Sequence, residues 1–487
     1  MAGLARGFVG RTLVGSAVAT SCALCLAGPA HPVAIAADAA GPPTLPGVVV
    51  VGDRQLKGTP ASIDRVEAAE LPARSGRSVS EWLDRVPGVA AHDRQNLAQD
   101  VQLSIRGFGA RSAFGVRGLQ IVADGIPGSM PDGQGQVSHV PLAALARVEV
   151  LRGPFSALYG NASGGVIEFF SVAPPAEANA GSRVATGSDA TVEASLWLAG
   201  PWSAHADGGF RLDGERLDTG GYRAHSSARR DIAQARLVGR SRMGTRLALT
   251  VNTLDLRADD PQGLTIEQAL ASPRAASAGA LAFDTRKRVR QVQAGLRVDQ
   301  SIGAHSAVTL STWGGARETF QMLSVPVAAQ APPGSGGGVV DLARDNAGVD
   351  VRWRGDTQLG ARAASLTIGV QNERSDEHRL GYENFVGAQL GAVGALRRDQ
   401  RDTVASHDVY AEARWLFVPR WTATLGVRRS RVDFRSRDAY IAPGNPDDSG
   451  DLHFRQTTPV VGLLFQPSDH VDLYANAGRG FETPSLA

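Results

Sequence analysis

Most of the chain after residue 181 alternates apolar and polar residues with a period of two. This period places successive side chains on opposite faces of a β-strand. Each segment of this kind is close to the roughly 9–11 residues that a tilted strand needs to cross a bilayer. In 407–417 one face carries Val409, Ala411, Ala413, Trp415 and Phe417. The same pattern recurs in 191–198, 246–252, 289–299 and 470–478.

The connections between these strands alternate in length. A soluble sandwich or propeller has no reason for strict alternation, whereas an outer-membrane barrel has short periplasmic turns and long outer loops. The polar residues of the second face suit a wet lumen. Short links lie near 200–205, 241–244, 300–305, 355–361, 418–421 and 467–470. Long links lie near 217–230, 258–287, 321–346, 375–404 and 436–453.

The expected fold class is therefore an antiparallel membrane β-barrel, of which about 13 strands are present. A barrel of the 22-stranded type would need about 500 residues after the linker at 174–181, and about 300 are present. The barrel is expected to be incomplete. The preceding part, 54–175, differs: a short helix in 78–88 and several short strands bounded by glycine or proline predict a small α+β domain.

The first 36 residues have the composition of a secretory signal peptide. Arg6 and Arg11 precede an apolar stretch at 13–28, and small residues near Ala36 offer a cleavage site. A transmembrane anchor and a lipoprotein site at Cys22 are the alternatives. The chain's two cysteines both lie in this stretch, so a mature chain would have no disulfide and no thiolate metal site.

The net charge and the glycine pattern exclude nucleic-acid-binding and nucleotide-binding proteins. The formal net charge is only +2, and Lys57 and Lys287 are the only lysines, so no bulk field attracts nucleic acid. The glycines of 153–165 are not followed by the lysine of a phosphate loop, and an apolar strand rather than a helix comes next. We expect them to serve tight turns and close backbone approach.

At this point several motifs resemble one family. The segments "LDRVPGV" (83–89), "LSIRGFGARS" (103–112), "VADGIP" (122–127) and "VEVLRGPFSALYGNASGGVI" (148–167) are similar to the plug domain of TonB-dependent outer-membrane receptors. "LYANAGRGFETPS" (473–485) is similar to a mid-barrel motif of that family. The resemblance implies a signal peptide at 1–36, a TonB-box segment at 37–53, a plug at 54–175 and a partial transmembrane barrel at 181–487.

The resemblance also implies a mechanism. In this family a ligand binds the outer loops and the plug apex, and the TonB energy transducer of the periplasm then pairs with the TonB box. Val48, Val49, Val50 and Val51 form an extended β-branched segment between Pro46 and Gly52, which suits strand addition. The alternative is an ordinary first strand of the plug. Uptake of a ferric siderophore or similar chelate across the Gram-negative outer membrane is the implied function.

Candidate site residues follow from the matching motifs. Arg106, Glu149 and Arg152 are expected at the contact between plug and barrel. Two glycine-rich plug loops, 107–118 and 126–139, are expected to touch the ligand. Their arginines would suit an anionic ferric chelate. The candidate contacts are Arg111, Phe114, Arg117, Met130 and Gln134.

Neither a resident metal nor a cofactor is expected, because no cluster of His, Asp and Glu points to direct coordination of a bare ion. Glu168 departs from the family, which usually has asparagine there. An enzyme is not expected: the chain has no G-x-S-x-G motif for a barrel lipase or protease. A passive porin or adhesin, a non-functional receptor fragment, and receptors for haem, cobalamin or carbohydrate are the remaining alternatives.

Overall fold

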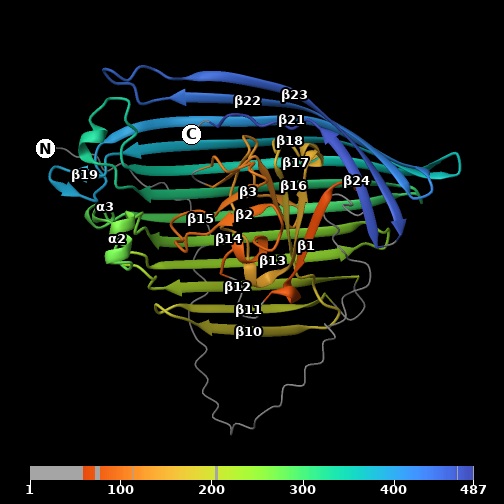
Figure 1. Cartoon of the computed structure of the whole chain (residues 1–487), viewed down its shortest axis with the longest axis horizontal. Helices are drawn as coiled ribbons and strands as arrows, with labels where there is room; N and C mark the ends of the chain where they lie inside the picture. The colour runs from red at the N-terminus through yellow and green to blue at the C-terminus, as the bar shows by residue number, and fades with distance from the viewer. Residues whose placement is uncertain (1–58, 72–76, 113–114, 203–206, 469, 486–487) are drawn as a thin grey trace, which may run out of the picture. The chain divides into compact units, whose positions relative to one another are not determined.

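A computed structural model describes residues 59–71, 77–112, 115–202, 207–468 and 470–485 (Figure 1). The predicted signal peptide and the predicted TonB-box segment lie outside the described residues. Two β structures follow one another along the chain. The first, residues 59–171, contains a five-stranded sheet and is called the plug below; the second, residues 179–478, is a 13-stranded sheet and is called the wall.

The plug is built around a mixed sheet of order β1-β8-β9-β5-β6, in which β5 runs parallel to β9. The short helix and the several short strands that the sequence predicted in this part are present. The elements are β1 (Ser62–Glu67), η1 (Ala68–Glu70), α1 (Ser80–Leu83), β2 (Val89–His92), β3 (Gln102–Ile105), β4 (Val116–Arg117), β5 (Leu119–Ala123), β6 (Ile126–Pro127), β7 (Gln134–Gly135), η2 (Leu142–Ala144), β8 (Leu145–Arg152), η3 (Pro154–Tyr159) and β9 (Gly165–Ser171).

Helix α1 is a single turn that covers this sheet. The backbone N–H of Ser80 donates to Ser78 Oγ at 3.2 Å at the start of the helix, and Gly88, at φ +77°, follows the turn at its end. Trp82 and Leu83 are almost fully buried. They pack into the apolar core of the plug, whose fully buried members include Leu103, Ile105, Leu119, Ile121, Val148, Val150 and Ile167.

Gly165 shows why the plug needs glycine where β9 begins. A Cβ at this position would lie 2.6 Å from Ile105 Cδ1 and 2.8 Å from the backbone oxygen of Leu151. The backbone oxygen is part of the β8–β9 ladder and cannot move aside. The prediction that the glycines of this motif permit close approach agrees with this geometry.

We expect Gly165→Val to destabilise the plug by about 1–3 kcal/mol, because overpacking a filled core forces strain on its neighbours. Gly263→Ala is the matched control, since nothing lies within 4 Å of a Cβ there. Proteolysis of the assembled protein measures the effect. Equal protease resistance of the two variants would contradict the steric role of Gly165.

The wall is one antiparallel sheet whose strands follow chain order, from β10 to β18 and then from β21 to β24. Its 13 strands confirm the predicted number. The strands are β10 (Asn179–Thr186), β11 (Val192–Pro201), β12 (Gly208–Thr219), β13 (Ala228–Arg240), β14 (Arg246–Asp259), β15 (Arg286–Ile302), β16 (Ser306–Met322), β17 (Val339–Leu359), β18 (Arg362–Tyr382), β21 (Leu396–Val418), β22 (Trp421–Asp438), β23 (Gly450–Ser468) and β24 (Val471–Gly478).

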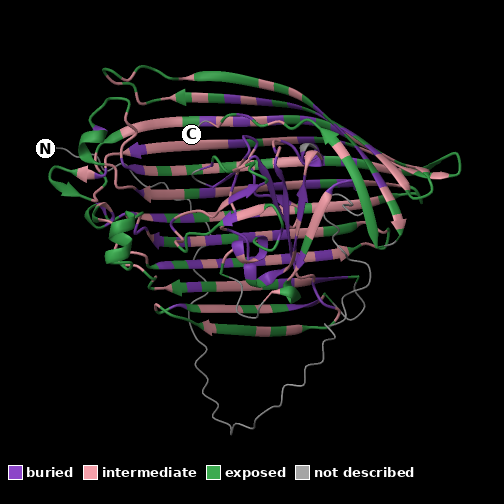
Figure 2. Ribbon diagram, viewed as in Figure 1, coloured by how far each residue is buried: buried purple, intermediate pink, exposed green. Residues whose placement is uncertain are grey.

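In the wall the apolar face is exposed and the polar face is buried, which is the reverse of a sheet in a soluble protein. In β22, Leu425 and Val427 are 59% and 41% exposed, whereas Thr424 and Arg428 are 0% and 1% exposed. Figure 2 shows the same alternation of buried and exposed residues along many strands of the sheet. An apolar face turned outwards and a polar face turned inwards are typical of a β-sheet that borders lipid and encloses a hydrated lumen. The predicted membrane barrel fold is therefore confirmed.

The connections alternate in length as predicted. Short turns join β13 to β14, β15 to β16, β17 to β18, and β21 to β22. Long connections lie at the other end and carry α2 (Ile266–Ala271), α3 (Ala278–Phe283), η4 (Val327–Gln330), β19 (Phe385–Val386) and β20 (Gln389–Leu390) (Figure 1). Within the described residues, no α-helix is both long and apolar enough to cross a bilayer.

The predicted strand length is wrong for the middle of the wall. β18 has 21 residues and β21 has 23, about twice the predicted 9–11. Much of the stretch 375–404, predicted as a long link, is therefore strand. The strand residues 375–379 and 397–403 within it are all polar, so hydropathy marks them as loop. Neighbouring strands nevertheless complete their backbone hydrogen bonds, as in the pairing of His378 with Arg401.

Candidate functional site

The plug contacts the polar inner face of the wall through buried arginines. Arg428 Nη1 of β22 donates to the Leu158 carbonyl oxygen of η3 at 2.8 Å. Arg236 of β13 donates to the Ser171 carbonyl oxygen at 2.9 Å and lies 3.3 Å from Asp124. Plug carbonyl oxygens thus supply hydrogen-bond partners to two buried arginines of the wall, as burial of charged groups requires.

A second contact is made by the segment 93–100, which joins β2 to β3. Leu97 packs against a cluster on the inner wall formed by Ile232, Leu254, Leu256 and Val289. Asn96 Nδ2 donates to Asp260 Oδ1 at 2.8 Å, and Gln99 donates to the other oxygen of the same carboxylate. Asp100 accepts a hydrogen bond from Lys287 Nζ at 2.7 Å. This segment therefore holds the plug to β14 and β15.

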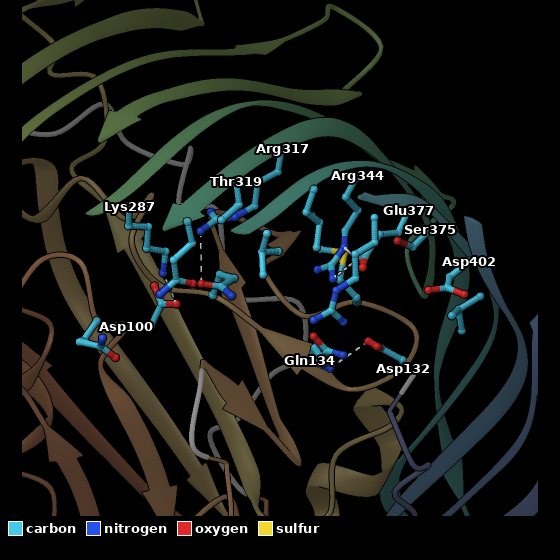
Figure 3. A pocket seen from close by; sticks show the side chains of 18 of the residues that line it. Asp100, Asp132, Gln134, Lys287, Arg317, Thr319, Arg344, Ser375, Glu377 and Asp402 are labelled. Atoms are coloured by element: carbon cyan, nitrogen blue, oxygen red, sulfur yellow. Dashed lines mark hydrogen bonds and ion pairs between the residues drawn. The ribbon is translucent and has the colours of Figure 1, made fainter. Parts of the chain in front are cut away.

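A cavity of about 270 Å³ opens beside this contact, between the plug and the wall. Its wall residues come from the ends of β15 to β18 and β21 that carry the long connections. Figure 3 shows side chains of both parts converging on it. The polar and charged residues that line it are Gln99, Asp100, Asp132, Gln134 and Gln136 from the plug and Lys287, Arg317, Thr319, Gln321, Arg344, Ser375, Glu377, Arg379 and Asp402 from the wall.

The cations of this cavity have different partners. Lys287 pairs with Asp100, and Arg344 pairs with Glu377 within the wall. Arg317 donates to neutral oxygens, those of Ser138 and Gln136 on the plug at 3.3 Å among them. Among the described residues, Arg379 makes no direct hydrogen bond or ion pair. A ligand oxygen entering the cavity therefore finds two guanidinium groups, those of Arg317 and Arg379, that make no direct ion pair, although Asp100, Glu377 and Asp402 lie near them.

Burial and charge shift the pKa values of three plug residues. Burial alone would raise the pKa of Asp100, but Lys287 and Arg317 outweigh it and lower that pKa, so Asp100 is ionised at neutral pH. Burial raises the pKa of Asp132. Burial, with the nearby charge of Arg317, lowers the pKa of His139 to about 3, so this imidazole is neutral at neutral pH.

The two predicted ligand loops meet in the structure. Arg117 in β4 pairs with Gln134 in β7, which joins 107–118 to 126–139. Met130 and Gln134 line the cavity. Arg117 instead donates to the Thr483 carbonyl oxygen at 3.3 Å, and Arg111 is exposed outside the cavity. Phe114 lies outside the described residues.

Of the three predicted plug–barrel residues, Arg106 and Arg152 both lie beside Gly88, whereas Glu149 belongs to the opposite face of β8 from Arg152. Glu149 pairs with Arg147 at 2.7 Å, and Arg152 pairs with Asp64 and donates to the Pro87 carbonyl oxygen. The Arg106 side chain is exposed and lies beside Gly88. The partners identified here for Glu149 and Arg152 are plug residues, so a contact of this group with a barrel stays a prediction.

Sequence reasoning missed the residues of the wall that make the cavity and the plug contacts. Lys287, Arg317, Arg344 and Arg428 lie in strands where arginine is frequent, and nothing local distinguishes them. One signal was present: Lys287 is one of only two lysines in the chain. No group of three His, Cys, Asp or Glu side chains within the described ranges is arranged to hold a metal ion.

Family models match most of the chain. Residues 55–166 match the model described as the TonB-dependent receptor plug domain. Residues 231–487 match the model described as TonB dependent receptor-like, beta-barrel. The second match alone covers more than half of the chain.

Curated relatives match over shorter stretches. The vitamin B12 transporter BtuB of Vibrio vulnificus is 28% identical over 164 residues, 33% of this chain and 26% of the relative. An iron-regulated outer membrane virulence protein of Vibrio cholerae is 36% identical over 121 residues, 23% of this chain and 17% of the relative. The aligned parts thus span about a quarter or less of these relatives.

Solved structures match over almost the whole described chain. The unliganded ferric citrate transporter FecA superposes with a TM-score of 0.74 at 21% identity, covering 87% of this chain and 63% of that protein. The ferric yersiniabactin uptake receptor FyuA of Yersinia pestis gives 0.64 at 17% identity, covering 86% and 64%. At these identities the likeness concerns the fold. The plug, the wall with its exposed apolar face and the two family matches all point to the same family. The chain belongs to the TonB-dependent receptors of the bacterial outer membrane.

Proposed function

We propose that this chain binds a ferric siderophore or a similar anionic metal chelate and takes it up actively, with energy delivered through the TonB box. The single observation that supports this most directly is the cavity between plug and wall. Its lining includes Lys287, Arg317, Arg344 and Arg379. Cationic side chains suit the anionic oxygens of ferric chelates, and guanidinium groups bind such oxygens in a directed way.

The position of the cavity suggests how binding is passed on. A ligand there touches the plug through Met130 and Gln134 and the wall through the ends of the strands. It therefore lies where binding energy can favour one plug position over another. The TonB protein would then pair with Val48–Val51 as an added strand and pull on the plug. The outer-membrane lipid surrounds the apolar face of the wall.

Cobalamin is the second candidate ligand, because a relative in Vibrio vulnificus is described as a vitamin B12 transporter. The cavity also has four carboxylates, but Arg317 and Arg379 make no direct ion pair with them, and these two guanidinium groups favour an anionic chelate over a ligand of low charge. Haem and carbohydrate are the remaining alternatives.

Uptake by a Gram-negative host that lacks its own receptors tests this proposal. Cells expressing the protein are given radiolabelled ferric citrate, ferric enterobactin or cyanocobalamin, with and without dissipation of the proton gradient. We expect gradient-dependent iron uptake from at least one ferric chelate. Uptake that survives loss of the gradient would favour a passive porin, and uptake of cyanocobalamin alone would favour the second candidate.

Filling the cavity provides a direct test of its role. Ser375 lines the cavity and is 6% exposed. A tryptophan there would occupy the space that the ligand needs, so Ser375→Trp is expected to weaken chelate binding by about tenfold or more. Arg374→Trp is the matched control, because Arg374 is the adjacent residue and is exposed. Equal binding by both variants, with equal assembly, would place the ligand elsewhere.

A further inference from the structure

We propose that Lys287 is the cation through which ligand binding loosens the plug: an anionic oxygen of the chelate replaces the Asp100 carboxylate on the Lys287 ammonium. This inference rests on the proposed function and deepens it, because it names a specificity-determining residue and the plug segment that responds. Lys287 Nζ and Asp100 Oδ2 lie 2.7 Å apart, and both residues line the cavity. Figure 3 shows the two side chains on one side of the cavity.

The buried Lys287 ammonium group needs an anionic partner both without and with bound ligand. Its side chain is 6% exposed, and an ammonium group that is buried without a counter-charge is strongly disfavoured. A chelate with an anionic oxygen can supply that charge, whereas a ligand without one cannot. The exchange gives Lys287 a new charge-assisted hydrogen bond but leaves Asp100 without its ion pair, so the ligand must supply an anionic oxygen. A neutral ligand would leave both charges unpaired.

This ion pair differs from the other one in the cavity. Arg344 in β17 and Glu377 in β18 both belong to the wall, so exchange at Arg344 would leave the plug contacts unchanged. Lys287 in β15 instead holds a residue of the plug. Of the two ion pairs between described lining residues, the pair of Lys287 and Asp100 is the one that joins plug to wall.

The segment released by the exchange has one further polar anchor on the wall. Asn96 and Gln99 both bind the Asp260 carboxylate, which is 4% exposed. Loss of the Lys287 contact therefore removes one of two polar anchors of 93–100 and leaves the other. The segment ends at β3, which enters the plug core through Leu103 and Ile105.

Two charge-removing variants separate this inference from a purely structural role. Lys287→Gln is expected to weaken binding of ferric citrate by about tenfold, because the ligand loses its ammonium partner. Asp100→Asn is expected to tighten it by about three- to tenfold, because the competing carboxylate is gone. Arg288→Gln and Asp93→Asn, which alter exposed residues nearby, are the matched controls. Affinity is measured by calorimetry on the purified protein in detergent, with cyanocobalamin as the neutral probe.

A structural role alone predicts effects of the same sign, because both variants break the same contact. Weaker ferric citrate binding by both variants, or unchanged binding by both, would overturn the inference and leave the proposed function standing. Failure of the wild-type protein to bind ferric citrate or ferric enterobactin would overturn both.

Hydrogen exchange on the wild-type protein tests the inference even if the variants fail to fold. In the wild-type protein, ferric citrate is expected to increase amide exchange in residues 96–100, because the segment loses its contact with Lys287. Lys287→Arg retains the charge and is expected to retain binding. Protection of 96–100 that stays the same or rises on ligand binding would contradict the release of this segment.

Discussion

Val49→Pro is expected to abolish uptake driven by the proton gradient and to leave the affinity for the ligand unchanged. Proline has no backbone N–H and cannot complete a strand that is added to a partner sheet. The predicted TonB box, Val48–Val51, precedes the plug in the sequence, and the proposed ligand contacts are residues of the plug and the wall, so these contacts are expected to be preserved. Uptake and binding are measured separately, by accumulation of radiolabelled iron in cells and by retention of the chelate on de-energised cells.

Val49→Thr is the matched control, since threonine keeps the β-branched side chain and the backbone donor. It is expected to transport at close to the wild-type rate. Undiminished uptake by the proline variant would show that 48–51 is not the TonB box. Loss of binding as well as uptake would instead indicate an ordinary first strand of the plug.

Arg428→Met has the second largest expected effect, on how firmly the plug is held. Arg428 is 1% exposed, binds Asp408 at 2.6 Å and Gln371 at 2.8 Å, and donates to the Leu158 carbonyl oxygen of the plug. Methionine would leave the Asp408 carboxylate buried without its cation, which typically costs about 3–5 kcal/mol. We expect the η3 segment of the plug to become sensitive to protease.

The neighbouring Arg429 supplies the control for this experiment. It lies on the opposite face of β22 and is exposed, so Arg429→Met is expected to change stability by less than about 0.5 kcal/mol. Arg428→Lys keeps the charge but not the fork of donors, and should fall between the two. Equal protease resistance of Arg428→Met and Arg429→Met would show that the plug is held by other contacts.

Much of the fold was predictable because its signals are local. Alternation of apolar and polar residues, as in 407–417, shows that a stretch is a strand with one apolar and one polar face, and this requires no knowledge of the neighbouring strands. Glycine and proline mark where strands end. The number of wall strands and the alternation of short and long connections followed from these signals alone.

The length of the wall strands was not predictable in the same way. Beyond the apolar band, residues such as those in 397–403 are polar on both faces, and only pairing with β18 shows that they belong to a strand. The hydrogen bonds that define them are made to another part of the chain. Local pattern carries no information on that partner.

The candidate site also has residues that the sequence could identify and residues that it could not. Met130 and Gln134 belong to a glycine-rich loop that could be singled out from its composition, and both line the cavity. Their partners across the cavity are residues of the wall that no motif marks. Asp100 and Lys287 are 187 positions apart, and their pairing exists only because the plug loop and the strand end meet in space.

The sequence alone thus determined the class of fold, the order of its parts and the family resemblance, because each rests on patterns within short stretches. The tertiary structure alone decided which cations face the plug, which carboxylates neutralise them and where the cavity lies. Ion pairs depend on distance and burial, and both are properties of the packed molecule rather than of any single segment.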